Sequence, residues 1–306
     1  MWPSRKPAAQ RLSDLLARHH GTVRRLPGVA RTEARDTLAW QMVASLRRLD
    51  YTRLLKQRPI DPARADPASP LFDPERAAIL YARNGKLDEA IWLVFLATHF
   101  GKHARSGWQR LREVYAGSNG RQWTWAAYSA DPAAFRRWLG RHEAHIGGGF
   151  GNHRKYASLR ADSEQGTPAV LESYLAWVGQ YDSHGQLVAD LVRSGGNDPH
   201  AIFDQFYRGM QVKQFGRLGK FDFLALIGRL DLAPITPGSA YLEKATGPLA
   251  GARLLYGDSR SADLDPRRLD GWLIELDRDL AIGMQAMEDA LCNWQKSPTR
   301  FIHFKG

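Results

Sequence analysis

Cysteine is almost absent from this chain of 306 residues, because Cys292 is the only one. A single thiol cannot close a disulfide within the chain, and it cannot supply a cysteine-based metal site. Histidines and carboxylates also do not gather at the spacing that metal ligands show. We therefore expect a protein of a reducing cytoplasm that works without a metal ion or another cofactor.

Long apolar runs are also missing. No uninterrupted apolar segment reaches the roughly 20 residues that a membrane-spanning helix needs, and the first residues lack the apolar core of a signal peptide. The sequence shows neither the alternating pattern of strands nor a repeat of fixed period. These absences argue against a membrane protein, a sheet-based fold and a repeat array.

Positive charge is abundant. Lysine and arginine number 43 against 32 aspartates and glutamates, which gives a formal net charge of +11. Such an excess favours a polyanionic partner, and nucleic acid is the first candidate. Charge governs association more than fold, so a basic protein with no nucleic-acid role remains the alternative.

The apolar spacing predicts helices throughout. Leu38, Met42 and Leu46 mark one face of a helix over 32–57, and the segment 87–99 is apolar all round, which is typical of a buried central helix. We expect an all-α protein with a loosely held arm carrying a short helix at 1–30, a main domain at 31–260 and a C-terminal part at 261–306. Further helices are predicted at 105–116, 132–139, 168–178, 184–192, 199–210 and, as one long helix, 267–293.

One glycine-marked stretch lies directly before an apolar helix. Gly216 and Gly219 stand there with the cations Arg217 and Lys220 beside them. A glycine-rich turn at a helix N-terminus leaves backbone N–H groups that suit phosphate. Lys220 is a candidate amine nucleophile or phosphate ligand, and Asp222 is a candidate carboxylate for charge stabilisation or simply a favourable first-turn charge.

A second stretch, 147–156, is rich in glycine and then turns polar and cationic. Its glycines would allow close approach to a ligand, such as a phosphate or a flipped base, although a flexible linker between two helical lobes is the alternative. Lys102 and His103, after the apolar helix, are candidates for a DNA-facing rim, while His99 is a core histidine or part of that rim. The candidate base-pocket residues are Phe150, Asn152, His153 and Tyr156, and the candidate DNA contacts from this loop are Arg154 and Lys155.

The segments 92–103, 148–156 and 215–256 together resemble the α-glutamyl/putrescinyl thymine pyrophosphorylases, particularly their third clade. The last segment also resembles the helix-hairpin-helix region of DNA glycosylases. The resemblance covers roughly residues 30 to 260. It implies a two-lobed, glycosylase-like helical fold and a link to hypermodified pyrimidines in phage DNA. Related bacterial proteins are implicated as anti-phage glycosylases that remove glucosylated hydroxymethylcytosine.

The resemblance therefore implies a monomeric DNA glycosylase that excises a bulky modified pyrimidine from double-stranded phage DNA. Cleavage of an N-glycosidic bond commonly uses a carboxylate to stabilise the sugar cation or to activate water, or a lysine that attacks C1′. The catalytic Asp of helix-hairpin-helix glycosylases would fall near 236–241, where this sequence has none. The nearest carboxylates are Asp222 and Asp231, and Asp231 matches the Asp expected in the pyrophosphorylase-like family.

Two other classes remain open. One is a transferase that replaces an activated group on modified thymine with an amine, for which Arg154, Lys155 and Lys220 would line a cationic pocket. The other is a DNA-binding protein without catalysis. Each carboxylate also has a purely structural interpretation, since Asp231 would suit the turn that ends its helix. The hairpin departs from the usual pattern, because its glycines are spaced Gly-x-x-Gly.

Overall fold

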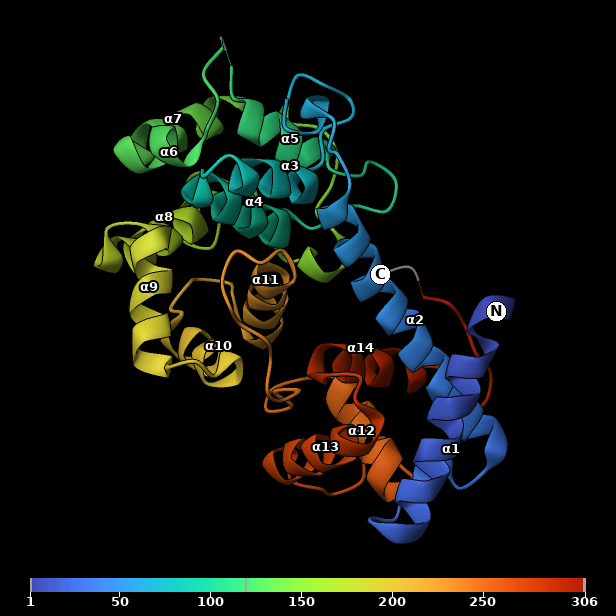
Figure 1. Cartoon of the computed structure of the whole chain (residues 1–306). Helices are drawn as coiled ribbons and strands as arrows, with labels where there is room; N and C mark the ends of the chain where they lie inside the picture. The colour runs from blue at the N-terminus through green and yellow to red at the C-terminus, as the bar shows by residue number, and fades with distance from the viewer. Residues whose placement is uncertain (1, 119, 305–306) are drawn as a thin grey trace. The chain divides into compact units, whose positions relative to one another are not determined.

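The computed structural model describes residues 2–118 and 120–304 (Figure 1). In these residues the regular structure is helical, with no strand and only two isolated β-bridges. The predicted all-α class is thereby confirmed, while the two-lobed helix-hairpin-helix arrangement stays a prediction. The α-helices are α1 Lys6–Thr22, α2 Thr32–Gln57, α3 Pro74–Arg83, α4 Leu87–Phe100, α5 Gln109–Ala116, α6 Trp125–Ala130, α7 Pro132–His142, α8 Thr167–Val178, α9 His184–Gly195, α10 Pro199–Gly209, α11 Arg217–Arg229, α12 Gly247–Gly257, α13 Pro266–Leu280 and α14 Met284–Trp294.

The chain forms two compact units. The first comprises Met1–Leu54 with Pro237–Gly306, and the second comprises Leu55–Thr236. The predicted division at residues 30 and 260 stays a prediction. Every residue proposed for the site falls in the second unit.

The N-terminal segment of the first unit differs from the expected loose arm. Helix α1 has 17 residues, and it packs on α13 with Leu12 and Leu16 buried. His19 is also fully buried and lies 2.6 Å from an oxygen of Asp279. Few apolar residues suffice here because Leu12, Leu15 and Leu16 all pack in or against the core of this unit.

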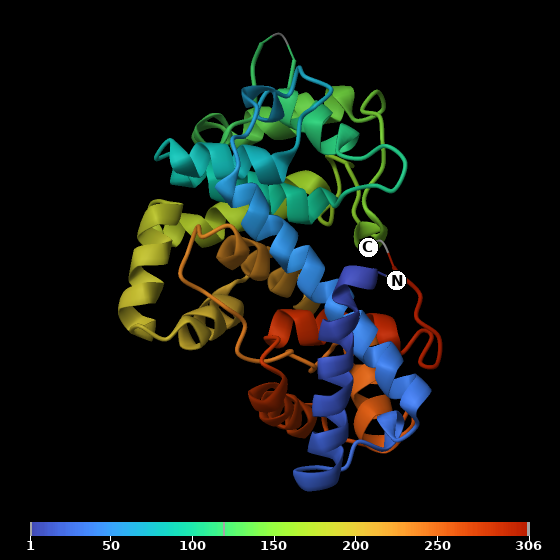
Figure 2. The same ribbon diagram turned by 45° about the vertical axis from the view of Figure 1, so that its right-hand side comes forward.

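The expected long helix at 267–293 is two helices, α13 and α14, which pack with α12 (Figure 2). Ala281 and Gly283 adopt positive φ angles of 51° and 81°, and the Asp277 carboxylate accepts the amides of Ile282 and Gly283. The prediction of one helix was wrong because the apolar spacing continues across this break: Leu280 and Met284 are both buried.

Helix α4 is the centre of the second unit, as predicted. Its residues from Ala90 to Phe100 are all buried. The Phe95 ring stacks on Tyr174 of α8 and on Phe215, with centroid distances of 3.6 Å and 4.8 Å. This packing fixes the segment before α11 against the middle of α4.

The aromatic residues at 123–128 belong to the core of the second unit. Trp123, Trp125 and Tyr128 are buried, and the last two lie on a short helix, α6. Thr124 caps this helix by accepting the amide of Ala127. A base-stacking role for this cluster is excluded by its burial.

Candidate functional site

Helices α10 and α11 and the turn 210–216 form a helical hairpin. Gly216 is the N-cap of α11 and makes no side-chain cap bond, and its Cα faces open space. Gly219 instead packs on the hairpin, because an added Cβ would lie 3.1 Å from the Phe215 ring. The guanidinium of Arg217, a predicted DNA contact, lies 4.7 Å from the centroid of the Phe221 ring. The residue is mostly buried, and its side chain packs along α11.

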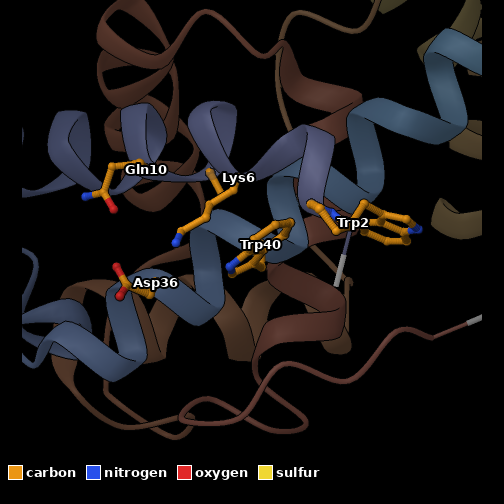
Figure 3. A pocket seen from close by; sticks show the side chains of 7 residues that line it. Trp2, Lys6, Gln10, Asp36 and Trp40 are labelled. Atoms are coloured by element: carbon orange, nitrogen blue, oxygen red, sulfur yellow. The ribbon is translucent and has the colours of Figure 1, made fainter.

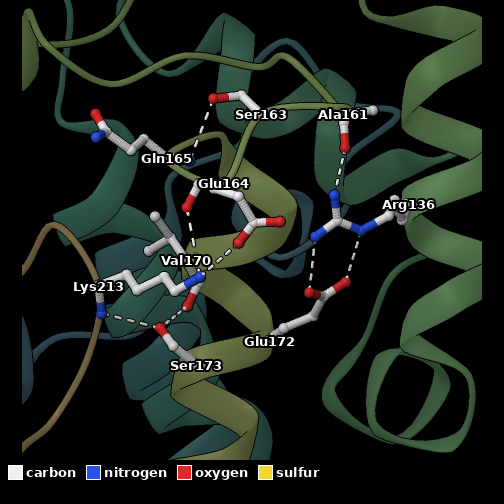
Figure 4. Close-up of polar contacts among 9 residues, drawn as sticks. All are labelled: Arg136, Ala161, Ser163, Glu164, Gln165, Val170, Glu172, Ser173 and Lys213. Carbon is white, nitrogen blue, oxygen red and sulfur yellow. Dashed lines mark hydrogen bonds and ion pairs between the residues drawn. The ribbon is translucent and has the colours of Figure 1, made fainter.

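The hairpin turn is anchored to α8. The amide of Lys213 donates to the Ser173 hydroxyl at 2.9 Å, and its ammonium lies 3.0 Å from a carboxylate oxygen of Glu164 (Figure 4). Nearby, the Arg136 guanidinium donates two hydrogen bonds to the Glu172 carboxylate. The Lys213 bonds thus join the turn to α8 and to the loop 158–166, and the Arg136 bonds join α7 to α8.

Lys220 and Asp222 point to different surroundings. The Lys220 ammonium donates to the Tyr207 carbonyl at 3.2 Å and lies 5.6 Å from that residue's ring. Residues two apart on a helix do not share a face, and Asp222 accordingly turns to another neighbour. The structure therefore does not join these two predicted catalytic groups in one cluster.

Asp222 is bound to Arg154 of the second glycine-marked stretch. Nη2 of Arg154 lies 3.0 Å from Oδ2 of Asp222, and Nε donates to the Thr98 carbonyl at 2.6 Å. The arginine side chain is 14% exposed and the aspartate 42%. Oδ1 of Asp222 has no hydrogen bond to the described residues. Three predicted segments, namely the end of α4, the 147–156 loop and α11, therefore meet at one half-exposed carboxylate.

Asp231 occupies the turn that ends α11. Its φ angle is 57°, its amide donates to the Gly228 carbonyl, and its carboxylate pairs with Lys56. The side chain is 73% exposed. Asp231 is nine positions after Asp222, and the seven helical steps from Asp222 to Arg229 alone correspond to about 10 Å along the axis. The two candidate carboxylates thus lie at different places on the surface of α11.

The glycine-rich loop approaches the chain itself. The Gly151 amide donates to the Phe100 carbonyl at 2.8 Å, and an added Cβ there would lie 2.8 Å from the backbone of Gly101. Arg110 donates to the carbonyls of Gly147 and Gly148. The loop is therefore fixed on the end of α4 and on α5, and the alternative of a flexible linker does not hold.

Phe150 takes part in the same packing. Its ring stacks on Phe100 with a centroid distance of 5.5 Å and an interplanar angle of 2°. The Arg110 guanidinium lies 4.9 Å from the centroid of the Phe150 ring. The ring also meets His99 edge-on. These contacts make Phe150 a support for the loop.

The tip that follows is exposed. Asn152 and His153 lie on a 3₁₀ turn, Asn152–Arg154, and Lys155 and Tyr156 follow it. Tyr156 is 93% exposed. The structure thus places the four predicted base-pocket residues apart: Phe150 is packed, while the others form an open polar and aromatic surface.

Lys102 and His103 border this surface. The Lys102 ammonium is exposed and lies 5.9 Å from the Trp108 ring. His103 is fixed by Ser106, whose hydroxyl lies 2.9 Å from Nδ1 and also accepts the Gly149 amide. An exposed cation and a positioned imidazole therefore stand beside the glycine-rich loop.

His99 is a core histidine. Its Nε2 lies 3.1 Å from the Thr167 hydroxyl, which itself donates to the Ser158 carbonyl. The hydroxyl proton is thus used, and His99 donates to Thr167. Burial, aided by the charge of Arg154, lowers the pKa of His99 to about 3, so the ring is neutral at pH 7.

Glu75 lies in the first turn of α3. Burial raises the pKa of its carboxyl group, and the positive charges of Arg229 and Lys102 act in the opposite direction. An acidic residue in the first turn of a helix is too common to signal such an environment.

Among the described residues no group of three or more metal-ligating side chains exists.

The second unit thus carries an uncapped helix start and an exposed carboxylate beside a cationic loop. Residues 33–306 match the family model of alpha-glutamyl/putrescinyl thymine pyrophosphorylase, clade 3. The chain belongs to this family, whose name places it among enzymes that act on modified bases in DNA. No curated protein and no solved structure matches the chain significantly. No helix in the described part is long and apolar enough to span a membrane.

Proposed function

We propose that the protein hydrolyses the N-glycosidic bond of a bulky modified pyrimidine in double-stranded DNA and leaves an abasic site. The observation that carries this proposal is the contact between Arg154 and Asp222. It presents a carboxylate at the surface where the two glycine-marked stretches meet, with Oδ1 available to a ligand. Asp231 is less suited, because it serves as the turn after α11 and pairs with Lys56.

The chemistry requires the nucleotide to leave the base stack before its glycosidic bond can break. As the bond to C1′ lengthens, the sugar gains positive charge, and Asp222 stabilises that charge or orients the attacking water. Water then adds its oxygen to C1′, and the base leaves with a proton. Arg154 holds the carboxylate of Asp222 in place through their ion pair.

The surroundings of Asp222 offer contacts for DNA. Lys102 and Lys155 are exposed cations on either side of the glycine-rich loop, and Tyr156 offers an open ring for stacking. The uncapped amides that follow Gly216 at the start of α11 suit a phosphate. Asn152 and His153 are the candidates for contacts with the base or its adduct.

The family match favours a second candidate, a transferase acting on thymine. In that reaction an amine nitrogen bonds to the methylene carbon on C5 of the base, and pyrophosphate leaves. Arg154, Lys155 and Lys220 would stabilise the leaving group. Arg154 already binds Asp222, and Lys220 already donates to the Tyr207 carbonyl. Both cations would therefore have to change partners to bind pyrophosphate. A DNA-binding protein without catalysis is the remaining alternative.

Mass spectrometry of the reaction separates these functions. The protein is incubated with DNA carrying glucosylated hydroxymethylcytosine, hypermodified thymine or pyrophosphorylated hydroxymethyluracil. Free modified base together with abasic sites supports the glycosylase, and from the resemblance we expect a role in defence against phage. A modified nucleoside that stays in the strand with a changed mass supports the transferase. DNA unchanged in every case contradicts both enzymes.

A further inference from the structure

A cavity of about 380 Å³ lies in the first unit, between the start of α1 and the early turns of α2 (Figure 3). Its lining residues belong to the first unit and Asp222 belongs to the second, and the proposed DNA chemistry does not use the cavity. Its lining residues are Trp2, Pro3, Lys6, Ala9, Gln10, Asp36 and Trp40.

Two pairs of side chains at helical spacing build the cavity. Lys6 and Gln10 are one turn apart on α1, and Asp36 and Trp40 are one turn apart on α2, so each pair shares a face. Figure 3 shows the Lys6 ammonium and the Asp36 carboxylate pointing toward the same space beside the Trp40 ring. The sequence therefore brings an ammonium, a carboxylate, an amide and a flat ring around one volume.

The polar groups of the cavity are only partly used. Oδ1 of Asp36 accepts the Ser13 hydroxyl at 2.6 Å, whereas Oδ2 has no hydrogen bond to the described residues. Lys6 and Asp36 form no ion pair with each other, although they face the same cavity. Gln10 donates to Asp14 through Nε2 and keeps its amide oxygen available.

The aromatic residues have different tasks. The Arg47 guanidinium lies 3.8 Å from the centroid of the Trp2 ring, and His303 meets that ring edge-on at 5.0 Å. Trp2 is thereby fixed as an end wall. Trp40, whose ring centroid is 6.4 Å from that of Trp2 at an interplanar angle of 48°, supplies the wall on which a flat ligand can stack.

We propose that this cavity binds a guanine base. Guanine carries a ring N–H beside an exocyclic amino group, and both donate in one direction, which matches the Asp36 carboxylate. Its carbonyl oxygen on the same edge accepts from Lys6, and its rings stack on Trp40. Adenine and cytosine place an acceptor nitrogen beside their amino group, and uracil and thymine flank their N–H with two carbonyls. Those edges would set a lone pair against the carboxylate.

Equilibrium dialysis with GMP, IMP and AMP tests the proposal directly. IMP lacks only the amino group, so GMP should bind about tenfold more tightly than IMP, since a hydrogen bond to a charged group is lost. AMP should bind at least as weakly as IMP. Asp36→Asn should abolish the preference for GMP over IMP, and Trp40→Leu should weaken the binding of every nucleotide. Thermal melting confirms that each variant is folded.

A matched pair of variants checks the cation. Lys6→Met should weaken GMP binding about tenfold, whereas Arg11→Met, which removes an exposed charge from the same helix outside the cavity lining, should leave it unchanged. A thymine oligonucleotide with one central guanine, compared with the all-thymine strand, shows whether the site takes a base from a DNA strand as well as from a free nucleotide.

Several outcomes would overturn the guanine site. They are no binding of GMP at millimolar concentration, equal affinity for GMP and IMP, equal affinity for GMP and AMP, or an Asp36→Asn variant that still prefers GMP. Every measurement uses unmodified nucleotides and no base release. A failure of the guanine proposal is therefore distinct from a failure of the proposed glycosylase.

Discussion

Arg154 links three segments through one side chain. Its guanidinium donates to the Thr98 carbonyl, to the His153 carbonyl and to Asp222. A planar group with five donors suits such a task, and lysine cannot reproduce its geometry. The residue is therefore a positioning group for Asp222, and it also closes the loop against α4.

Replacing Arg154 should lower stability. We expect Arg154→Met to reduce the free energy of unfolding by about 1–3 kcal/mol, because the Thr98 carbonyl loses its donor and Asp222 its partner. Arg154→Lys should recover only part of this loss. Urea unfolding measures the stability of both variants. An Arg154→Met variant as stable as the wild type would show that the Arg154 contacts do not stabilise the fold.

The buried His99 predicts a dependence of stability on pH. Its folded pKa of about 3 lies below the unfolded value of 6.5, so the unfolded state binds the proton first. Stability is full above pH 6.5 and decreases as pH falls toward 3. Between pH 6.5 and 5 the loss from this group should be about 2 kcal/mol.

The variant His99→Gln isolates that contribution, because glutamine keeps an N–H donor for Thr167 and does not titrate. The difference in unfolding free energy between wild type and variant should shrink as pH falls from 7 to 5. A difference that is constant over this range would contradict the assignment of His99 as a neutral core residue.

Sequence reasoning found Asp222 and Asp231 but could not rank them. Each stands in a segment of ordinary helical composition. What distinguishes them is the partner that folding supplies: Arg154, which is 68 positions away, and Lys56, which is 175 positions away. A local pattern carries no information about such long-range pairs. The environment of Glu75, which includes the charges of Arg229 and Lys102, also depends on residues that are distant in the sequence.

At the scale of elements, the glycine-rich loop shows how one pattern supports two explanations. The run of glycines predicted a close approach to a ligand, and in the structure the group that the loop approaches closely is the backbone of the chain itself. Gly151 lies against Gly101 and the Lys102 amide. A ligand and a neighbouring backbone place the same demand on the sequence, namely the absence of Cβ.

Gly151→Ala tests this packing against a matched substitution, Gly179→Ala. Both glycines have φ near −61°, so alanine causes no backbone strain at either. An added Cβ meets backbone at Gly151 and nothing at Gly179. Gly151→Ala should cost about 1–3 kcal/mol of stability, and Gly179→Ala should be neutral or slightly stabilising. Equal urea midpoints for the two variants would show that the loop is loosely held.

Helix boundaries were predictable where a cap or an apolar stripe marks them. The bounds of α2 agree with the prediction, and α10 begins at Pro199 after the capping Asp198, as expected. The break between α13 and α14 was not predicted, because it depends on the left-handed Ala281 and on Asp277, whose carboxylate binds the freed amides. Ala281 and Asp277 are not typical helix breakers, whereas Gly283, with a φ angle of 81°, is one and was the available signal for this break.

At the scale of the whole molecule, the all-α class follows from the absence of alternating segments, and the family match covers residues 33–306. The grouping into two units does not follow from composition, because the first unit combines both ends of the chain. Pairing of distant segments depends on tertiary packing, which no local periodicity encodes.

The net charge of +11 predicts DNA binding that depends on salt. If about four phosphates are neutralised, affinity should fall about a hundredfold between 50 and 200 mM salt. Lys155→Met should reduce the slope of log K against log salt by about one, and Arg260→Met, an exposed cation of the other unit, should leave it unchanged. Fluorescence anisotropy with a duplex measures the slope. Affinity that does not vary with salt would argue against a DNA partner.

The most direct test of the central claim compares Asp222→Asn with Asp231→Asn on whichever modified DNA the wild type processes. Both variants remove one exposed carboxylate from the same stretch. The rate of base release should fall at least about a hundredfold for Asp222→Asn, with DNA affinity unchanged, while Asp231→Asn should retain the wild-type rate. Base release at the wild-type rate by Asp222→Asn, or its loss only in Asp231→Asn, would contradict the placement of the catalytic carboxylate beside Arg154.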